Sequence, residues 1–577
     1  MKKSNVTLLV FSVTILFVSQ VLAAEFHVST RNQLKEALSM SAGNKDAKDT
    51  IYLAAGIYTG EYRLDGFRII EGEENEIKVC GEDGTTAEQV IIDGEDTSNI
   101  IYIDSNNSNV NVIFQGLTIQ RGGGDNSTGK AAFIRVGGNI EFIKCIIDHN
   151  CKKPTNGRVL NLYSKNITKI YQSTISNSAI SDVTYSYWDN YEYININSNT
   201  VFIHENTFIN NRGIAASIND AYSVTINSNQ ITNNEGGISC SNIKHLYISN
   251  NVVSNNYNGR GFFINHASNL KIINNIIKYN RSREYTYSKW TYSVGGGIYL
   301  NDTNECIISH NTFTSNIGQK GGALYINSAS NLKIFNNFLN NNKAAIGGAL
   351  YIINCNIFDI INNSYANNIS SKEIWHTSNG GAIYIEANDT TSFNFYNNIF
   401  WNNTSVGSGN DIFIKNYANN AAIFNNIVSD LSGAYDQGGN NSDADPMFAD
   451  PQNNDYHLSP NSPCINAGNN DAPNLPETDL DNLPRIVDNI VDIGAYEFTT
   501  TEKIPSDQNE DWKLSQEEFN AYAEAWRKGE TWQKGPEPIP IDYVTRSGYL
   551  QKKAEKYKNE GGKKPTCWKP DDNNTKK

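Results

Sequence analysis

The chain has 577 residues, with 47 Lys and Arg against 61 Asp and Glu, so its formal net charge is −14. This charge disfavours nucleic acid as a partner, because phosphate backbones are held by basic surfaces. A chain of this length usually forms several domains, but an internal repeat occupies most of it, and a solenoid lengthens without starting a new core.

Residues 1–23 have the pattern of a signal peptide. Lys2 and Lys3 precede an apolar run from Val6 to Leu22, and Ala23 is the small residue expected before a cleavage site. Such flanks are typical of signal peptides, and no other segment approaches the ~20 apolar residues of a membrane span. We therefore expect a secreted, extracellular protein, retained at the cell surface, with no membrane span in the mature chain.

One phrase recurs between residues 200 and 430: alternating apolar residues, an Asn, a hydrophobic pair and a second Asn, as in VTINSNQITNN (224–234). The period of two on both sides of the first Asn predicts two short strands that meet at a bend. Asn tolerates the left-handed backbone of a tight corner, and its amide can bond to neighbouring coils. A stacked ladder is therefore predicted at Asn206, Asn229, Asn251, Asn275, Asn311, Asn337, Asn363, Asn398 and Asn426. In earlier, less regular coils we assign the same position to Gly116, Cys145 and Ser173.

A third strand completes each coil. Two glycines, a small residue, Ile or Leu, Tyr, and Ile or Leu follow one another at 295–300, 321–326, 347–352 and 380–385. Alternation sends the apolar residues beside each Tyr inward and the Tyr outward. We therefore expect four outward rings, stacked about 5 Å apart on successive coils: Tyr299, Tyr325, Tyr351 and Tyr384.

Three strands per coil predict an all-β fold, a parallel β-helix solenoid with three sheets. The coil phrases resemble the pectin lyase-like superfamily, and the alternation of Phe313-x-x-Asn316 with Gly-Gly-Ala-Leu at 321–324 resembles the repeats of polymorphic outer membrane proteins. Residues 26–60 resemble the superfamily's N-terminal cap, a helix over the open core, and 443–498 resemble the final segment of choice-of-anchor Q proteins. The resemblance implies a right-handed β-helix but leaves the chemistry open, because the superfamily contains lyases, hydrolases, adhesins and passenger domains.

Three coils carry insertions between the phrase and the next Gly-Gly strand, at 181–194, 281–293 and 369–379. They contain Tyr and Trp, and exposed rings with polar tips are typical of sugar-binding surfaces. In the superfamily that the chain resembles, loops of this turn wall a groove above the next sheet. We expect that groove to bind an extended polysaccharide or cell-surface glycan, with the four Tyr as its floor and with Trp188, Trp290, Trp375, Arg281 and Arg283 from the insertions. In the alternative, the loops shield the sheet edge and the Tyr rings only stabilise packing.

The catalytic residues, if there are any, are unknown at this point. β-Helix hydrolases need a close set of Asp carboxylates, and β-helix lyases need a cationic base. The only Asp-Asp pair is Asp571-Asp572, in the tail. Arg281 and Arg283 could serve a lyase, but a solvated loop explains them equally. We favour a non-catalytic glycan-binding or adhesive protein; the alternatives are a polysaccharide lyase or glycoside hydrolase, and a structural surface-layer component.

The C-terminal end carries a calcium-loop pattern. Residues 507–518 fit the twelve-residue EF-hand loop, with oxygen ligands from Asp507, Asn509, Asp511, the Lys513 carbonyl, Ser515 and Glu518. Trp512 departs from this pattern, because it stands where Gly usually supplies a positive φ. A helix is predicted from Ser515, with one face formed by Phe519, Tyr522, Ala523 and Trp526, and a second helix is predicted within 539–560. Loop and helix resemble half of a dockerin repeat, which implies one Ca²⁺ and a docking partner; the alternative is an acidic linker before a helix.

These patterns divide the chain into six parts. They are the signal peptide (1–23), an N-terminal cap with the first coils (24–110), the β-helix repeats (111–430), the C-terminal coils with the choice-of-anchor Q-like segment (431–498), a linker (499–506), and the EF-hand-like or dockerin-like module with a disordered end (507–577).

Overall fold

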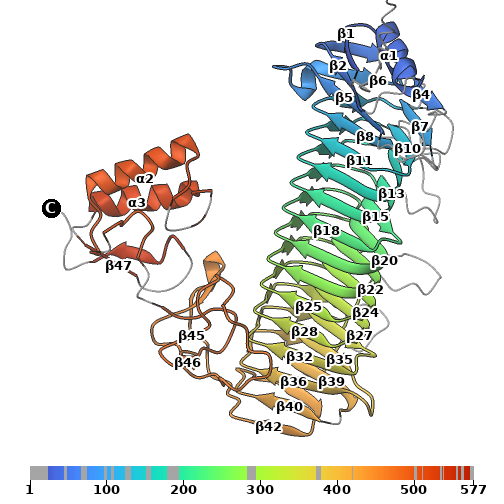
Figure 1. Cartoon of the computed structure of the whole chain (residues 1–577). Coiled ribbons are helices and arrows are strands. Elements are labelled where there is room, and N and C mark those ends of the chain that lie inside the picture. Colours follow the sequence, from blue (N-terminus) through green and yellow to red (C-terminus); the bar gives the residue numbers. More distant parts are fainter. Residues whose placement is uncertain are drawn as a thin grey trace, which may run out of the picture.

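The computed structural model describes residues 24–571, apart from 44–47, 66–74, 97–99, 106–109, 124–130, 151–157, 179–193, 283–293, 372–377, 419, 500–502, 510, 533–535, 537, 554–555 and 560–563. The chain winds into a parallel β-helix, whose coils stack from the blue end to the orange end of Figure 1. Each regular coil gives one strand to each of three faces. The predicted solenoid of parallel strands is therefore confirmed, although the strands of two faces are joined into one continuous sheet.

Face 1 contains the four strands that follow the Gly-Gly turns, β24 (Ile298–Asn304), β27 (Leu324–Ser330), β31 (Leu350–Ile353) and β35 (Ile383–Glu386). The same face also contains β4 (Tyr62–Asp65), β7 (Ile101–Ser105), β10 (Ala132–Val136), β17 (Ile214–Asn219), β39 (Ile412–Tyr417) and β41 (Leu431–Ala434). Four long strands belong to face 1 and continue around a corner onto face 2: β13 (Leu160–Tyr171), β15 (Ile194–His204), β20 (Gly236–Ser249) and β22 (Phe262–Ile273).

Face 2 contains the strand before each ladder Asn: β1 (Glu25–Val28), β2 (Lys48–Leu53), β5 (Asn75–Gly81), β8 (Val110–Gln115), β11 (Ile140–Ile143), β18 (Ser223–Asn227), β25 (Cys306–Ser309), β28 (Leu332–Phe335), β32 (Ile357–Ile361), β36 (Ser392–Tyr396), β40 (Ala421–Phe424) and β42 (Gln437–Gly439).

Face 3 contains the strand after each ladder Asn: β3 (Gly56–Thr59), β6 (Val90–Asp93), β9 (Thr118–Gln120), β12 (Ile146–Asp148), β14 (Thr174–Ser176), β16 (Thr207–Ile209), β19 (Gln230–Thr232), β21 (Val252–Ser254), β23 (Ile276–Lys278), β26 (Thr312–Thr314), β29 (Phe338–Asn340), β33 (Ser364–Ala366) and β37 (Ile399–Trp401). A small sheet follows it, formed by β30 (Lys343–Ala344), β34 (Ile369–Ser370) and β38 (Thr404–Ser405).

The Asn ladder lies at the corner between faces 2 and 3, as predicted. Asn311 shows the pattern: its Nδ2 donates to Asn337 Oδ1 at 3.0 Å, and its Oδ1 accepts from the backbone N of Asn275 at 2.9 Å. The left-handed conformation belongs to the preceding residue, such as Asn274 with φ of 58° or His310 with φ of 56°, and not to the ladder Asn. The assignment of Gly116 was therefore wrong: Gly116 takes the left-handed position with φ of 62°, and the buried Leu117 takes the ladder position.

A second ladder, which we did not predict, stands five residues further along each coil. The Nδ2 of Asn316 donates to Asn342 Oδ1 at 3.1 Å, and the Nδ2 of Asn342 donates to Asn368 Oδ1 at 3.1 Å. It corresponds to the second Asn of the repeated phrase. Both ladders satisfy corner amides that no strand pairs, so each coil is tied to the next at two corners.

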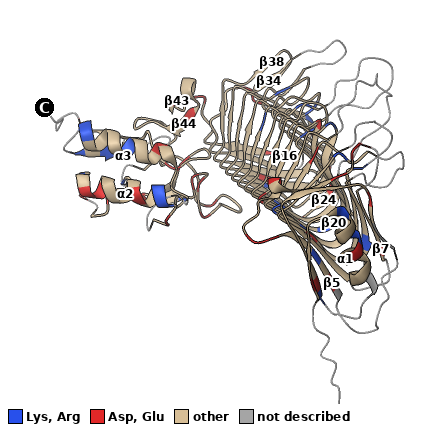
Figure 2. Ribbon diagram, turned by 90° about the horizontal axis from the view of Figure 1, so that it is seen from above, with Lys and Arg blue, Asp and Glu red and all other residues tan. Residues whose placement is uncertain are grey.

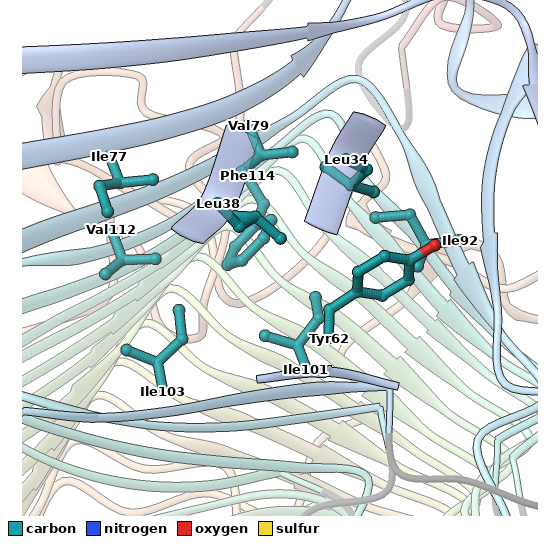
Figure 3. A pocket seen from close by; sticks show the side chains of 10 residues that line it. All are labelled: Leu34, Leu38, Tyr62, Ile77, Val79, Ile92, Ile101, Ile103, Val112 and Phe114. Atoms are coloured by element: carbon teal, nitrogen blue, oxygen red, sulfur yellow. The ribbon is translucent and has the colours of Figure 1, made fainter. Parts of the chain in front are cut away.

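Helix α1 (Arg31–Gly43) packs on the first coils (Figure 1). Leu34 and Leu38 point at Tyr62 and at the inward residues of the first face 2 strands, including Ile77 and Val79 (Figure 3). The helix thus covers apolar side chains that a first coil would otherwise expose.

The C-terminal segment (443–498) lies along the corner between faces 2 and 3. It contains β43 (Phe448–Asp450), β44 (Asp455–Leu458), β45 (Ile486–Val487) and β46 (Ile490–Val491). Its apolar side chains, with Phe448 and Tyr456 among them, pack against Phe338 of face 3. The left-handed corner residues hold its backbone: Asn362 Nδ2 donates to the Asp492 carbonyl at 2.9 Å, and Asn397 Nδ2 donates to the Asn469 carbonyl at 3.1 Å.

Two buried polar clusters fix the fold of this segment. Arg485 donates to Glu497 Oε1 at 3.1 Å and also hydrogen-bonds Asn336 of the β-helix. His457 contacts Asp455 at 2.7 Å and Asp481 at 2.8 Å. The polar residues of 479–485 and 491–498, with Asp455 and His457, therefore hold the segment together and attach it to the coils.

Beyond residue 503 a small module contains α2 (Gln516–Lys528), α3 (Ile541–Lys553), β47 (Tyr557–Asn559) and β48 (Trp568–Pro570). Both predicted helices are present. They run antiparallel, so that the acidic first turn of each lies beside the basic last turn of the other (Figure 2). The predicted apolar face of α2 needs one correction: Trp526 is 38% exposed, and Ala525 is buried beside Tyr522 instead.

Candidate functional site

The Gly-Gly turns set the register of face 1. Gly295, Gly321, Gly347 and Gly380 have φ between 61° and 68°. A Cβ on Gly321 would lie 2.0 Å from the Leu324 carbonyl oxygen, so no larger residue fits this turn. Because each turn is the same, each Tyr leaves face 1 at the same height on its own coil.

The four predicted Tyr rings are stacked on face 1, and a ring at each end extends the stack. We call the six rings the aromatic ladder: Phe263, Tyr299, Tyr325, Tyr351, Tyr384 and Phe413. Successive centroids are 4.9 to 5.4 Å apart, and successive planes differ by 1° to 18°. The inward neighbours Ile298 and Leu324 are fully buried, which confirms the predicted alternation.

This stacking differs from the open floor that we expected. Each inner ring has both faces covered by its neighbours, so a ligand can reach only ring edges and hydroxyls. Tyr351 and Tyr384 are 2% and 6% exposed, whereas Tyr299 and Tyr325 are half-buried. Burial raises the pKa of Tyr325 and of Tyr384 to about 12, so their hydroxyls are neutral hydrogen-bonding groups.

Two cations lie against the ladder at the edge where face 1 begins. The Arg260 guanidinium lies 5.0 Å from the Tyr299 centroid, and its Nε donates to the Val294 carbonyl at 2.6 Å. Lys320 Nζ lies 4.8 Å from the Tyr351 centroid. Burial lowers the pKa of both cations. The Arg260 guanidinium also lies 5.5 Å from the Phe263 centroid, and Tyr325 lies between Tyr299 and Tyr351, which the two cations contact.

A hydrogen-bonded network joins the ladder to the next coils. The Tyr351 hydroxyl donates to Glu386 Oε2 at 2.9 Å, and Lys320 Nζ donates to that hydroxyl at 3.4 Å. Lys415 Nζ donates to Glu386 Oε1 at 2.6 Å. Burial raises the pKa of Glu386, but the bonds from Lys415 and Tyr351 outweigh it and leave this pKa below its usual value.

Four of these residues were not predicted from the sequence: Arg260, Lys320, Glu386 and Lys415. A signal existed for two of them, since Arg260 and Lys320 each directly precede a glycine at the start of a face 1 strand. The others gave none, because their pairing depends on the register of β35 with β39.

Most of the predicted insertion residues lie outside the described part of the chain: Trp188, Trp290, Trp375 and Arg283. The gaps at 179–193, 283–293 and 372–377 each fall after a face 3 strand and before the next face 1 strand, which is the predicted turn. Arg281 is described and exposed. Its backbone bridges to Ile317, and Ile317 bridges to Lys343 of the small sheet, so the Arg281 backbone lies beside that sheet and not on face 1.

The predicted calcium loop is folded around its own backbone amides. Asp507 Oδ2 accepts from the Trp512 N at 3.0 Å and from the Tyr557 hydroxyl at 2.6 Å. Trp512 has φ of 64°, so it adopts the backbone that Gly usually supplies at this position. Asp511 Oδ1 accepts from the Lys513 N at 2.8 Å. Burial raises the pKa of Asp507, with Tyr557 opposing the shift.

The end of the loop begins α2. Ser515 caps the helix, because its Oγ accepts from the Glu518 N at 3.1 Å, and Glu518 Oε2 accepts from the Ser515 N at 3.0 Å. Glu518 Oε1 reaches back to the Gln508 N at 3.0 Å and to the Asn509 N at 3.3 Å. Across the described part of the chain, no three His, Cys, Asp or Glu side chains form a metal-binding group by themselves, so an ion here would also need the amide, hydroxyl and carbonyl oxygens.

The family described as "Right handed beta helix region" matches residues 155–292. Among solved structures, the chain resembles the periplasmic alginate epimerase AlgG (10% identity, 73% of this chain and 84% of that one, TM-score 0.34). It also resembles a mannuronic acid specific polysaccharide family 6 lyase from human gut microbiota (10% identity, 72% of this chain and 87% of that one, TM-score 0.26). A third similar structure is PfbA, a surface adhesin of Streptococcus pneumoniae (13% identity, 67% of this chain and 89% of that one, TM-score 0.33).

No curated protein matches the chain. In the described residues, no helix is both long and apolar enough to cross a membrane. The matched family region and the observed coils agree: this chain contains a right-handed parallel β-helix.

Proposed function

We propose that the chain is an exported, surface-retained β-helix protein that binds an extended polysaccharide along face 1 without cleaving it. The observation that carries this proposal is the half-buried Tyr325 between the rings that Arg260 and Lys320 cover. Phenol hydroxyls and cations are groups that bind sugar hydroxyls and sugar carboxylates.

The length of the site suits a polymer. From Phe263 to Phe413 the ladder takes five steps, roughly 24 Å at the spacing of parallel strands. An extended pyranose chain has a similar repeat, so a chain lying along the axis meets an equivalent group on each coil. A small molecule is better held by a closed pocket.

Affinity electrophoresis in gels that contain neutral or uronate polysaccharides tests this function. The double substitution Arg260→Gln with Lys320→Gln should reduce retention about tenfold or more, the equivalent of ~1.4 kcal/mol. Lys343→Gln, on the exposed small sheet, is the matched control and should not change retention. Equal retention of the double variant and the parent protein would refute binding at this site.

A second candidate function, a polysaccharide lyase, is favoured by the network of Lys320, Tyr351 and Glu386. In β-elimination a base removes the proton beside a uronate carboxylate, a C–C double bond forms as the glycosidic C–O bond breaks, and an acid protonates the leaving oxygen. Lys320, with its lowered pKa, would be the base and Tyr351 the acid. A hydrolase needs two carboxylates, whereas Glu386 is hydrogen-bonded to a phenol and a cation, Tyr351 and Lys415. Ultraviolet absorbance of unsaturated product, lost in Lys320→Gln, would establish the lyase.

The proposal includes a calcium-binding tail that retains the protein at the surface through a docking partner. The oxygens of Asp507, Asn509, Asp511, Ser515 and Glu518, with the Lys513 carbonyl, would hold one Ca²⁺. Support comes from the positive φ of Trp512 and from the all-oxygen donor set. Bound calcium would tie the loop to the start of α2. Loss of cell-surface retention in calcium chelator, with β-helix stability unchanged, is the expected result.

A further inference from the structure

Three exposed aromatic rings gather on face 2, away from the aromatic ladder. Phe202 of β15, Tyr222 before β18 and Tyr247 of β20 are 37%, 52% and 40% exposed. These strands lie on consecutive coils (Figure 1). Clustered exposed rings on a soluble protein mark an interaction site more often than isolated ones do.

The register of face 2 spaces two of these rings in a way that the aromatic ladder does not. Phe202 pairs with Thr225, and Thr225 pairs with Tyr247, so the rings stand in one column, two coils and about 10 Å apart. In the aromatic ladder, adjacent coils both carry rings that cover each other. Here the small Thr225 leaves the intervening level without a ring, so the ring sides facing that level are not stacked on another aromatic residue.

Cations surround this cluster. Lys244 Nζ lies 4.8 Å from the Tyr222 centroid, whose ring also meets His245 edge-on at 5.0 Å. Lys271 stands on the coil after Tyr247, in the same column. Within the described chain neither Lys244 nor Lys271 forms a salt bridge, although the protein has a net charge of −14. The cluster therefore offers two lysines without a salt bridge, whereas the Glu205 carboxylate beside it is paired with His204 at 3.2 Å.

We infer that Phe202, Thr225 and Tyr247 form a second glycan-binding site, for a pyranose chain that carries anionic groups. Phe202 and Tyr247 each lie one strand spacing from the level of Thr225. The space between the two aromatic rings therefore has the height that one stacked ring needs. A pyranose fits there with its C–H faces toward Phe202 and Tyr247, and Lys244 and Lys271 bind carboxylate or sulfate groups of the same chain.

The chemistry of the cluster favours this ligand over a protein partner. A stable protein interface buries roughly 800 Å² on each side around an apolar centre. Here the rings are separated by hydrogen-bonding side chains, since Thr225, His204 and Asn227 lie between or beside them, and Asn227 Nδ2 contacts His204 Nε2 at 3.0 Å. Isolated rings separated by polar groups match the alternating faces and hydroxyls of a sugar polymer.

Filling the space tests the proposal without removing a side chain. Thr225→Tyr should continue the stack from Phe202 to Tyr247, as adjacent rings do in the aromatic ladder, and should keep or raise the melting temperature. The probes are carboxymethylcellulose and hydroxyethylcellulose, which share a glucan backbone and differ in charge. All variants carry Arg260→Gln and Lys320→Gln, so that binding on face 1 does not contribute.

Affinity electrophoresis should show the background protein retained by carboxymethylcellulose, with retention at least several-fold weaker in hydroxyethylcellulose. Thr225→Tyr, and separately Phe202→Ala with Tyr247→Ala, should each reduce retention about tenfold. Tyr417→Ala, which removes a ring of similar exposure on β39, is the control and should have no effect. Full retention of Thr225→Tyr, or no retention of the background protein by either polymer, would overturn the inference.

Discussion

Replacing Asn311 with Leu tests whether the Asn ladder between faces 2 and 3 holds the coils together. The side chain is fully buried, and its Oδ1 accepts from both the backbone N and the Nδ2 of Asn275 at 2.9 Å. Its Nδ2 donates to the Ile272 carbonyl at 2.8 Å. Leu has nearly the same size but none of these bonds. The backbone N of Asn275 loses the acceptor that the ladder gives it, and the Ile272 carbonyl loses a donor, whereas the Nδ2 of Asn275 keeps the Ile248 carbonyl.

A buried polar group that loses its hydrogen-bond partner costs about 1–3 kcal/mol. Two such groups predict that the free energy of unfolding falls by roughly 2–6 kcal/mol. Urea denaturation followed by circular dichroism measures this loss, and hydrogen exchange should show it concentrated in the coils of β22 and β25, because a solenoid is stabilised by its neighbouring repeats. Thr312→Val, an outward change on the adjacent strand, is the control and should stay within about 0.5 kcal/mol. A value for Asn311→Leu as small as that of the control would refute the structural role of the ladder.

Three further predictions concern the aromatic ladder, the calcium loop and the C-terminal segment. Tyr351→Phe should destabilise the fold by about 1–3 kcal/mol in urea, because the buried hydroxyl holds Glu386; no change would mean that this bond contributes little. Glu518→Gln in the full chain should weaken calcium binding at least about tenfold in calorimetry, and unchanged affinity would exclude the proposed ligand set. Burial raises the pKa of Glu497 to about 8 from 4.5; burial lowers the pKa of His457, but its hydrogen bonds to two carboxylates outweigh this and raise it to about 9 from 6.5. Both groups bind more protons in the folded protein, so the stability that they contribute is full below their unfolded pKa values and is lost as pH rises through about 8 and 9. Limited proteolysis of the C-terminal segment should therefore accelerate over that pH range. A cleavage rate independent of pH would contradict this predicted loss of stability.

The coil repeat, the three faces and the outward direction of the Tyr residues could be predicted, because a period of two fixes which side chains point inward. The left-handed corner could not be placed, since phrases such as Asn274-Asn275 put two Asn together and either one suits the conformation. The exposed fraction of each ring in the aromatic ladder could not be predicted, for another reason. Whether Tyr351 is open depends on Lys320, which is 31 residues away in the chain and covers a ring of the next coil.

The face 2 cluster was missed even though its signal was present in the sequence. In the phrases VFI (201–203), VTI (224–226) and LYI (246–248), the middle residue points outward, so Phe202, Thr225 and Tyr247 could have been read as one column. Only a ring on every coil, as on face 1, was predicted to form a binding surface. A continuous column of rings buries its own faces and so stabilises the solenoid, whereas a column that alternates rings with small residues keeps those faces for a ligand. In a β-helix the spacing of aromatic residues along a column, more than their number, therefore separates packing from binding.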